Sequence, residues 1–192
     1  RSLEKGGWKQ LAEFPFDSSI KRMSVIYDAP ADDKPEEGSI VESDKSIVFT
    51  KGAVERILDL CDYVGCGADQ QPVTEELKES VLGQMNRLAS QGQRVLAIAY
   101  RPWEGRFRAK QSSSTAEDEA LRGEVEQGLT LLGLAGIYDP PRRETKPSIG
   151  ECSQAGIKVH MLTGDHPQTA RAIAAEVNIL PPPDKMRLLP AD

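Results

Sequence analysis

Thr163, Gly164 and Asp165 stand between a short apolar run and a helix-like pattern, in KVHMLTGDHPQTARAIAAEV from Lys158 to Val177. The glycine permits close approach to the backbone, the threonine hydroxyl can bond a phosphoryl oxygen, and the aspartate can cap the helix or orient a neighbouring group. Anions bind where parallel strands end, because helix N-termini present free N–H groups there. The loop could therefore handle an anion, but a strand–turn–helix junction with an Asp cap is also common without a ligand.

Short runs rich in β-branched or aromatic residues predict three strands in the first two thirds of the chain. They span residues 22–28, 46–50 and 94–100. Apolar residues at helical spacing predict one helix that starts just past Lys51 and Gly52, and another that Thr74 caps and Gly92 ends. Residues 106–128 are rich in serine and then in charge, which predicts a surface loop with one exposed helix, the candidate linker.

The pattern changes at Leu129. Apolar runs at residues 129–138 and 157–162 predict strands, and a helix pattern follows each of them. This β-α-β-α order is typical of a parallel α/β sheet.

Length, charge and hydropathy limit the classes of protein to which this chain could belong. With 192 residues and 39% hydrophobic content, the chain can form one large domain or two small ones. A net charge of -6 argues against broad binding to nucleic acid or anionic lipid. No apolar run is long enough to span a bilayer, and no secretory signal is recognisable. The start and end of the sequence suggest a piece of a longer protein.

The three cysteines, Cys61, Cys66 and Cys152, indicate a reducing compartment and not a disulfide framework. Cys61 and Cys66 form a C-x4-C spacing, but no second pair or nearby histidine completes a zinc set. His160 and His166 are expected to pack or to cap a helix. No GxxxxGK sequence supports P-loop chemistry.

Five segments occur in a telling order: EFPFDSSIKRMSV, KGAVERIL, QRVLAIAYR, DPPRRET and GIKVHMLTGDHPQTA. Together they resemble the cytoplasmic nucleotide-binding (N) and phosphorylation (P) domains of cation-transporting P-type ATPases, from about Leu11 to Leu180. Fungal sodium or potassium efflux pumps look closest, with calcium pumps next. The resemblance implies an α/β fold: an α+β N domain with an antiparallel sheet in residues 1–128, incomplete at its start, then a partial P domain with a haloacid-dehalogenase-like parallel sheet in residues 129–192.

The resemblance also implies a nucleotide site. Phe16 would be the adenine platform, with Lys21, Lys51 and Gly52 in the pocket, Arg94 and Arg142 at the phosphates, and Asp139 at the ribose hydroxyl. Thr163, Gly164 and Asp165 would form the phosphoryl-contact loop of an incomplete catalytic site. Each residue has a plainer alternative: Phe16 or Phe14 could be core, Lys21 solvated, Lys51 a surface residue, Arg94 an ion-pair partner, and the Asp139–Arg142 segment a stiff linker.

In such pumps the γ-phosphoryl group of ATP passes to an aspartate in a DKTG motif, and GDGxND helps to hold Mg²⁺. Neither motif occurs here, so the chain is expected to bind ATP at most, with Mg²⁺ arriving on the nucleotide and no metal ligand assigned. The parent would couple ATP hydrolysis, through an aspartyl-phosphate, to export of a cation, Na⁺ or K⁺, across a membrane.

The implied partners are ATP and the remaining domains and membrane helices of that pump, with the fragment itself soluble at the cytoplasmic face and without nucleic-acid or direct membrane contact. Three alternatives stay open. They are a calcium pump, a stand-alone nucleotide-binding or interaction module, and a dehalogenase-like phosphatase, which the lack of a DxD motif disfavours.

Overall fold

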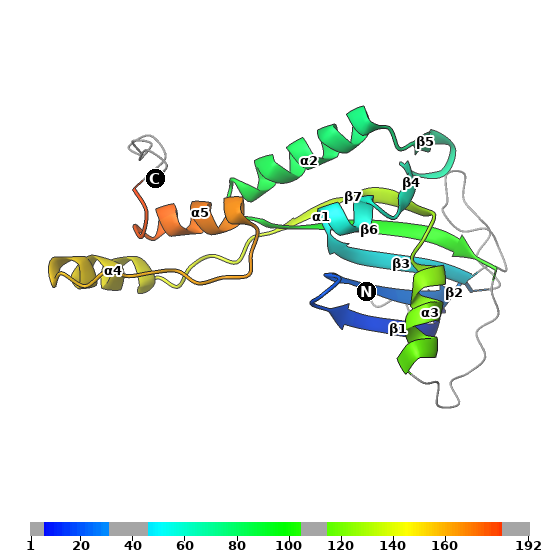
Figure 1. Ribbon diagram of the computed structural model, residues 1–192, viewed down its shortest axis with the longest axis horizontal. Helices are drawn as coiled ribbons and strands as arrows, with labels where there is room; N and C mark the ends of the chain where they lie inside the picture. The colour runs from blue at the N-terminus through cyan, green and yellow to red at the C-terminus, as the bar shows by residue number, and fades with distance from the viewer. Residues whose placement is uncertain (1–5, 31–45, 105–114, 182–192) are drawn as a thin grey trace. The chain divides into compact units, whose positions relative to one another are not determined.

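Seven strands form one mixed sheet in the computed structural model, which describes residues 6–30, 46–104 and 115–181 (Figure 1). The strand order is β1-β2-β3-β6-β7-β4-β5. The strands are β1 (Lys9–Asp17), β2 (Arg22–Asp28), β3 (Ser46–Ala53), β4 (Cys61–Val64), β5 (Gln71–Pro72), β6 (Arg94–Trp103) and β7 (Leu129–Ile137). Four pairings, β1–β2, β2–β3, β3–β6 and β4–β5, are antiparallel, and β4–β7 is parallel. The predicted α/β class with an antiparallel sheet is confirmed.

Five α-helices accompany the sheet in the described part of the chain. They are α1 (Val54–Leu58), α2 (Glu75–Ala89), α3 (Thr115–Val125), α4 (Thr145–Gln154) and α5 (Pro167–Glu176), with a 3₁₀ turn at Gly67–Asp69. The hydroxyl of Thr74 accepts a hydrogen bond from the N–H of Leu77 at 3.2 Å, so its predicted cap at α2 is confirmed. None of the described helices is both long and apolar enough to cross a bilayer.

The chain divides into two compact units. The first holds Arg1–Leu82 and Leu96–Ala135, and the second holds Gly83–Val95 and Gly136–Asp192. Most of β7 therefore belongs to the first unit, where β6 and β4 are its neighbours in the sheet. The boundary between the N domain and the partial P domain at residue 128 stays a prediction.

One hydrophobic cluster of the first unit lies between the sheet and α3. Phe14, Ile26, Val48 and Val125 form a buried cluster, and Leu11, Ala12, Trp103 and Leu121 pack against it. Figure 1 shows α3 lying against the first strands of the sheet. The predicted helix is present, but it packs on the sheet instead of being exposed, because Leu121 and Val125 are spaced by four and place one apolar stripe of α3 on the sheet.

The second unit differs from the predicted β-α-β-α order. Residues 157–162 form no strand within the described chain, which corrects the strand prediction. A strand needs a partner for its backbone hydrogen bonds, and β7, the expected partner, already lies between β4 and β6. The serine-rich part of the candidate linker lies outside the described residues.

Candidate functional site

The end of β1 presents one of its two phenylalanines to solvent. Phe14 is 7% exposed and belongs to the core, whereas Phe16 is 64% exposed. The pairing of β1 with β2 shifts in register between Phe14 and Asp17, and this irregularity interrupts the regular alternation of side chains. An exposed aromatic ring on a fixed strand end is available for stacking on a flat ligand.

The turn from β1 to β2 is tightly bonded. The N–H of Lys21 donates to the carbonyl oxygen of Asp17 at 2.7 Å, and Lys21 has a left-handed backbone with φ of 53°. The hydroxyl and N–H of Ser19 both donate to the Asp17 carboxylate at 2.7 Å. These bonds, the hydroxyl's first, hold the pKa of Asp17 below its usual value. The turn therefore has a defined shape, and Lys21 leaves it with an exposed side chain.

Gly52 brings the β1–β2 turn close to β3. A β-carbon built on Gly52 would lie 2.5 Å from the carbonyl oxygen of Lys21 and 2.7 Å from Cβ of Arg22. That same carbonyl accepts a hydrogen bond from the N–H of Ala53 at 3.0 Å. The absence of a side chain at Gly52 thus permits an approach by the chain's own backbone. Lys51, the residue before it, is exposed.

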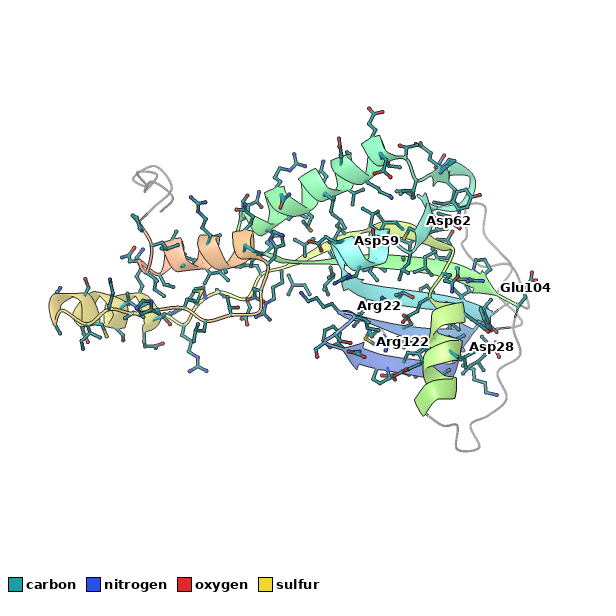
Figure 2. The ribbon with its side chains drawn as sticks, viewed as in Figure 1. Arg22, Asp28, Asp59, Asp62, Glu104 and Arg122 are labelled. Carbon is teal, nitrogen blue, oxygen red and sulfur yellow. The ribbon has the colours of Figure 1, made fainter. Side chains whose placement is uncertain are left out.

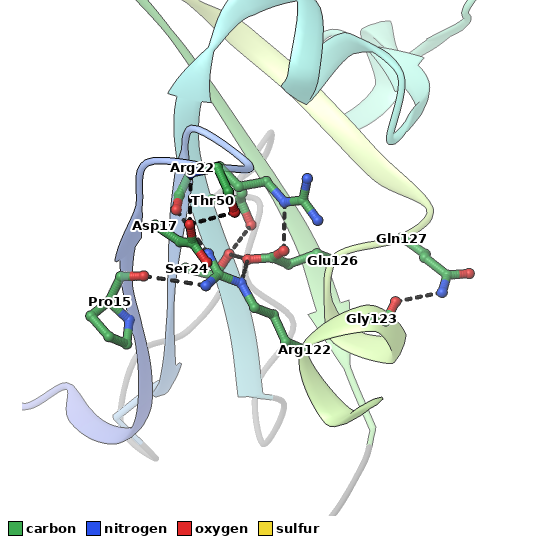
Figure 3. A network of polar contacts seen from close by, with 10 residues as sticks. Pro15, Asp17, Arg22, Ser24, Thr50, Arg122, Gly123, Glu126 and Gln127 are labelled. Atoms are coloured by element: carbon green, nitrogen blue, oxygen red, sulfur yellow. Dashed lines mark hydrogen bonds and ion pairs between the residues drawn. The ribbon is translucent and has the colours of Figure 1, made fainter. Parts of the chain in front are cut away.

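Behind this turn lies an ionic network that the sequence did not reveal (Figure 3). The Glu126 side chain is fully buried, and its carboxylate accepts from Nε of Arg22 at 2.6 Å and Nε of Arg122 at 3.0 Å. The Ser24 hydroxyl donates to the same carboxylate at 2.6 Å and lies 2.9 Å from the Thr50 hydroxyl. Arg22 and Arg122 come from β2 and α3 and lie side by side in Figure 2. The only signal for this network was the pair Arg122 and Glu126 at helical i, i+4 spacing.

In the second unit, two predicted site residues contact each other directly. Arg94 and Asp165 form a two-point ion pair, with Nε to Oδ1 at 2.9 Å and Nη2 to Oδ2 at 3.1 Å. The side chain of Arg94 remains 63% exposed, whereas that of Asp165 is 20% exposed. The ion-pair alternative for Arg94 is therefore realised in this state of the chain, with the phosphoryl-loop aspartate as its partner.

The rest of the predicted phosphoryl-contact loop makes local hydrogen bonds. The Thr163 hydroxyl accepts from the N–H of Asp165 at 3.1 Å, and Thr163 and Gly164 are exposed. His166, and not Asp165, caps α5, because its Nδ1 accepts from the N–H of Gln168 at 3.3 Å. Asp165 thereby orients a neighbouring group instead of capping the helix.

Asp139 and Arg142 lie in the segment between β7 and α4. Both side chains are exposed, and the carbonyl oxygen of Arg142 accepts from the N–H of Thr145 at 3.0 Å. The four residues Phe16, Lys21, Lys51 and Gly52 belong to the first unit, while the other predicted site residues belong to the second.

The cysteine pair is poorly suited to metal binding. Cys61 is buried, donates to the carbonyl oxygen of Ile57 at 3.1 Å, and has its pKa raised by burial to about 12. A metal ligand must be a thiolate, which this environment disfavours. The described residues contain no group of three or more His, Cys, Asp or Glu side chains that could hold a metal ion.

A family model described as the P-type ATPase cytoplasmic domain N matches residues 2–144. This span covers both the described sheet and the exposed Phe16 and Lys51. The chain belongs to the P-type ATPases. The resemblance noted from the five sequence segments is therefore confirmed.

Several P-type ATPases are similar to most of this chain. A sodium/potassium exporting P-type ATPase, cta3, of Schizosaccharomyces pombe is 43% identical over 171 residues, which are 88% of this chain and 14% of that protein. A calcium-transporting ATPase of Bacillus subtilis is 34% identical over 186 residues, 97% of this chain and 18% of that protein. Sodium/potassium exporting P-type ATPase 1 of Saccharomyces cerevisiae is 37% identical over 182 residues, 91% of this chain and 15% of that protein. The chain thus spans less than a fifth of the length of these relatives.

Proposed function

We propose that this chain binds ATP through the β1–β2 turn and β3 of the first unit. The observation that carries the proposal is the exposed ring of Phe16, at 64%, beside a turn that carries Lys21 and packs against the strand of Lys51. An aromatic face can stack on adenine, and two ammonium groups can meet the phosphates. Membership of the N-domain family supports the same reading.

The residues present fit a nucleotide but not a separate metal centre. Phe16, Lys21 and Lys51 supply an apolar platform and positive charge, and Mg²⁺ is usually held through few carboxylates plus substrate phosphates. Mg²⁺ is accordingly expected to arrive with ATP. In the second unit, Arg94, Asp139 and Arg142 would add contacts to the phosphates and the ribose.

We further propose that the chain is part of a cation pump at the cytoplasmic face of a membrane, with residues 129–192 forming part of its phosphorylation domain. Its other domains and membrane helices would supply the phosphorylated aspartate and the ion path, while Thr163, Gly164 and Asp165 would contact the transferred phosphoryl group. We take Na⁺ or K⁺ as the ion on the 43% identity to one sodium/potassium exporter, against 34% and 37% to two calcium transporters.

Titration of the isotopically labelled chain with ATP, followed by NMR, tests the binding site. The amide signals of Phe16, Lys51 and Arg94 and the ring signals of Phe16 should shift in a saturable way, and Lys51→Ala should weaken binding. Lys9→Ala is the matched control, because Lys9 is an exposed lysine at the start of β1. Shifts confined to other residues, or none at millimolar ATP, would contradict the proposed site.

A further inference from the structure

The buried ionic network behind the β1–β2 turn does more than fill space. Glu126 has no exposed side-chain surface, and the side chains of Arg22 and Arg122 are only 18% and 13% exposed. A buried carboxylate is costly unless charges and hydrogen bonds satisfy it, and an apolar replacement of the whole group is often neutral or stabilising. A network of this kind is best explained by the geometry that it imposes on the chain around it.

Arg122 holds both ends of the turn. Its Nη1 donates to the carbonyl oxygen of Pro15 at 3.3 Å, and its Nη2 donates to the carbonyl oxygen of Arg22 at 2.8 Å. Pro15 directly precedes Phe16, and Arg22 directly follows Lys21. One guanidinium group, itself fixed by Glu126, thus ties α3 to the backbone on either side of the two residues proposed to contact ATP (Figure 3).

Glu126 extends the same network to β3. The Ser24 hydroxyl gives its proton to Glu126, so the Thr50 hydroxyl is the donor in the 2.9 Å contact with Ser24. Ser24 and Thr50 are direct partners in the β2–β3 register. Because side chains alternate along a strand, Lys51 points to the opposite face of the sheet from Thr50 and Glu126. The network therefore supports, from behind, the strand that carries Lys51.

We propose that Arg122 and Glu126 are positioning residues of the nucleotide site, which set the placement of Phe16 and Lys21 without touching ATP. The inference rests on the proposed ATP binding. It accounts for a buried charged cluster at the C-terminal end of α3, where Arg122 and Glu126 make hydrogen bonds to residues of both β1 and β2.

The test uses Arg122→Lys, because lysine keeps the charge beside Glu126 but cannot span both carbonyl oxygens. Arg101→Lys is the matched control. Arg101 also donates from one guanidinium to two backbone carbonyls, those of Glu124 at 3.2 Å and Gln127 at 2.5 Å, but neither lies in the β1–β2 turn. Both variants are made in the full chain, and ATP affinity is measured by calorimetry beside the urea unfolding midpoint.

Arg122→Lys should weaken ATP binding by about tenfold, the scale of one lost hydrogen bond. Arg101→Lys should bind ATP with normal affinity, although its urea unfolding midpoint should be similar to that of Arg122→Lys. At saturating ATP, the NMR shifts of Phe16 and Lys21 in Arg122→Lys should differ from those of the unaltered chain, and those of Lys51 should change less. Without nucleotide, the Lys21 amide should exchange with solvent faster in Arg122→Lys only.

Three results would overturn the inference. Unchanged ATP affinity in Arg122→Lys would remove the positioning role and leave the proposed function intact. An equal loss in Arg101→Lys that follows the unfolding midpoint would reduce the network to a general stabilising one. No binding by the unaltered chain would refute the proposed function itself. The exchange of the Lys21 amide would then report only whether Arg122 holds the β1–β2 turn in place.

Discussion

Phe14 and Phe16 stand two positions apart on one strand and lie in opposite environments. The family resemblance made Phe16 the platform candidate, and the sequence left open that either Phe16 or Phe14 is core beside the first strand. The structure separates them, since Phe14 packs with Ile26, Val48 and Val125 while Phe16 stays 64% exposed. Their roles should accordingly separate in experiment.

Phe16→Ala should weaken ATP binding by about 1 to 3 kcal/mol, the cost of losing base stacking on an aromatic ring, and should leave the unfolding free energy nearly unchanged. Phe14→Ala should lower the free energy of unfolding by about 3 to 5 kcal/mol, because it leaves a cavity in the core. Calorimetric ATP titration and urea unfolding of both variants check the pair. Normal ATP affinity in Phe16→Ala would disprove the platform.

The Arg94–Asp165 pair makes another residue prediction. Asp165 occupies Nε and Nη2 of Arg94, the donors that a phosphate would need. If Arg94 binds phosphate, Asp165→Asn should tighten ATP binding by up to about fivefold, because a largely exposed ion pair is worth at most about 1 kcal/mol. The same change in an Arg94→Ala background should have no effect. Weaker ATP binding in Asp165→Asn alone would mean that Asp165 supports the site instead of competing with it.

Individual strands could be predicted from the sequence where a local pattern of residues determines them. The strands at residues 22–28, 46–50 and 94–100 were found from their β-branched and alternating residues, and their full extents are β2, β3 and β6. The neighbours of a strand were not predictable, because they depend on contacts far apart in the chain. The run at 129–138 is a strand as expected, but β4 and β6 flank it in place of residues 157–162.

The same limit explains the missed network around Glu126. A charged stretch after a serine-rich segment is typical of a solvated linker, and nothing local says that Glu126 will meet Arg22, over a hundred residues earlier. The family resemblance named Phe16, Lys21, Lys51 and Gly52 as nucleotide residues, and the structure holds these four in one unit. The residues that lie behind them became visible only in the fold.

The close approach of the β1–β2 turn to β3 predicts the effect of a change at Gly52. Gly52→Ala should lower the free energy of unfolding by about 1 to 3 kcal/mol, the usual cost of overpacking, because the new β-carbon would meet backbone atoms of Lys21 and Arg22. Urea unfolding followed by tryptophan fluorescence is suited to this test, since Trp8 and Trp103, the chain's two tryptophans, both lie in the first unit.

Gly83→Ala is the matched control for that substitution. Gly83 lies inside α2, and a β-carbon there would have no neighbour within 4 Å. Alanine is the better helix former by about 0.5 to 1 kcal/mol, so this variant should not be destabilised. A Gly52→Ala chain as stable as the unaltered protein would show that the turn can move away from β3 freely.

In the proposed pump, ATP binding and phosphoryl transfer depend on different sets of residues. The family match covers residues 2–144, and the relatives are at least five times longer than their matched parts. The residues proposed to hold ATP are present, but the 192 residues contain neither DKTG nor GDGxND. In the proposed pump, those motifs would provide the nucleophile and help to hold Mg²⁺.

The chain alone should therefore bind ATP with Mg²⁺ but should not hydrolyse it to release phosphate. Phosphoryl transfer relies on positioning and charge neutralisation around a nucleophile, and in the proposed role Thr163 and Asp165 would supply only contacts to the transferred group. Phosphate release from ATP is measured for the unaltered chain and for Lys51→Ala, which should bind ATP poorly. Release that is equal in both preparations is assigned to a contaminating enzyme. Release that the unaltered chain shows and Lys51→Ala lacks would mean that this chain carries a nucleophile or activates water, and that the phosphorylated aspartate is not required for its chemistry.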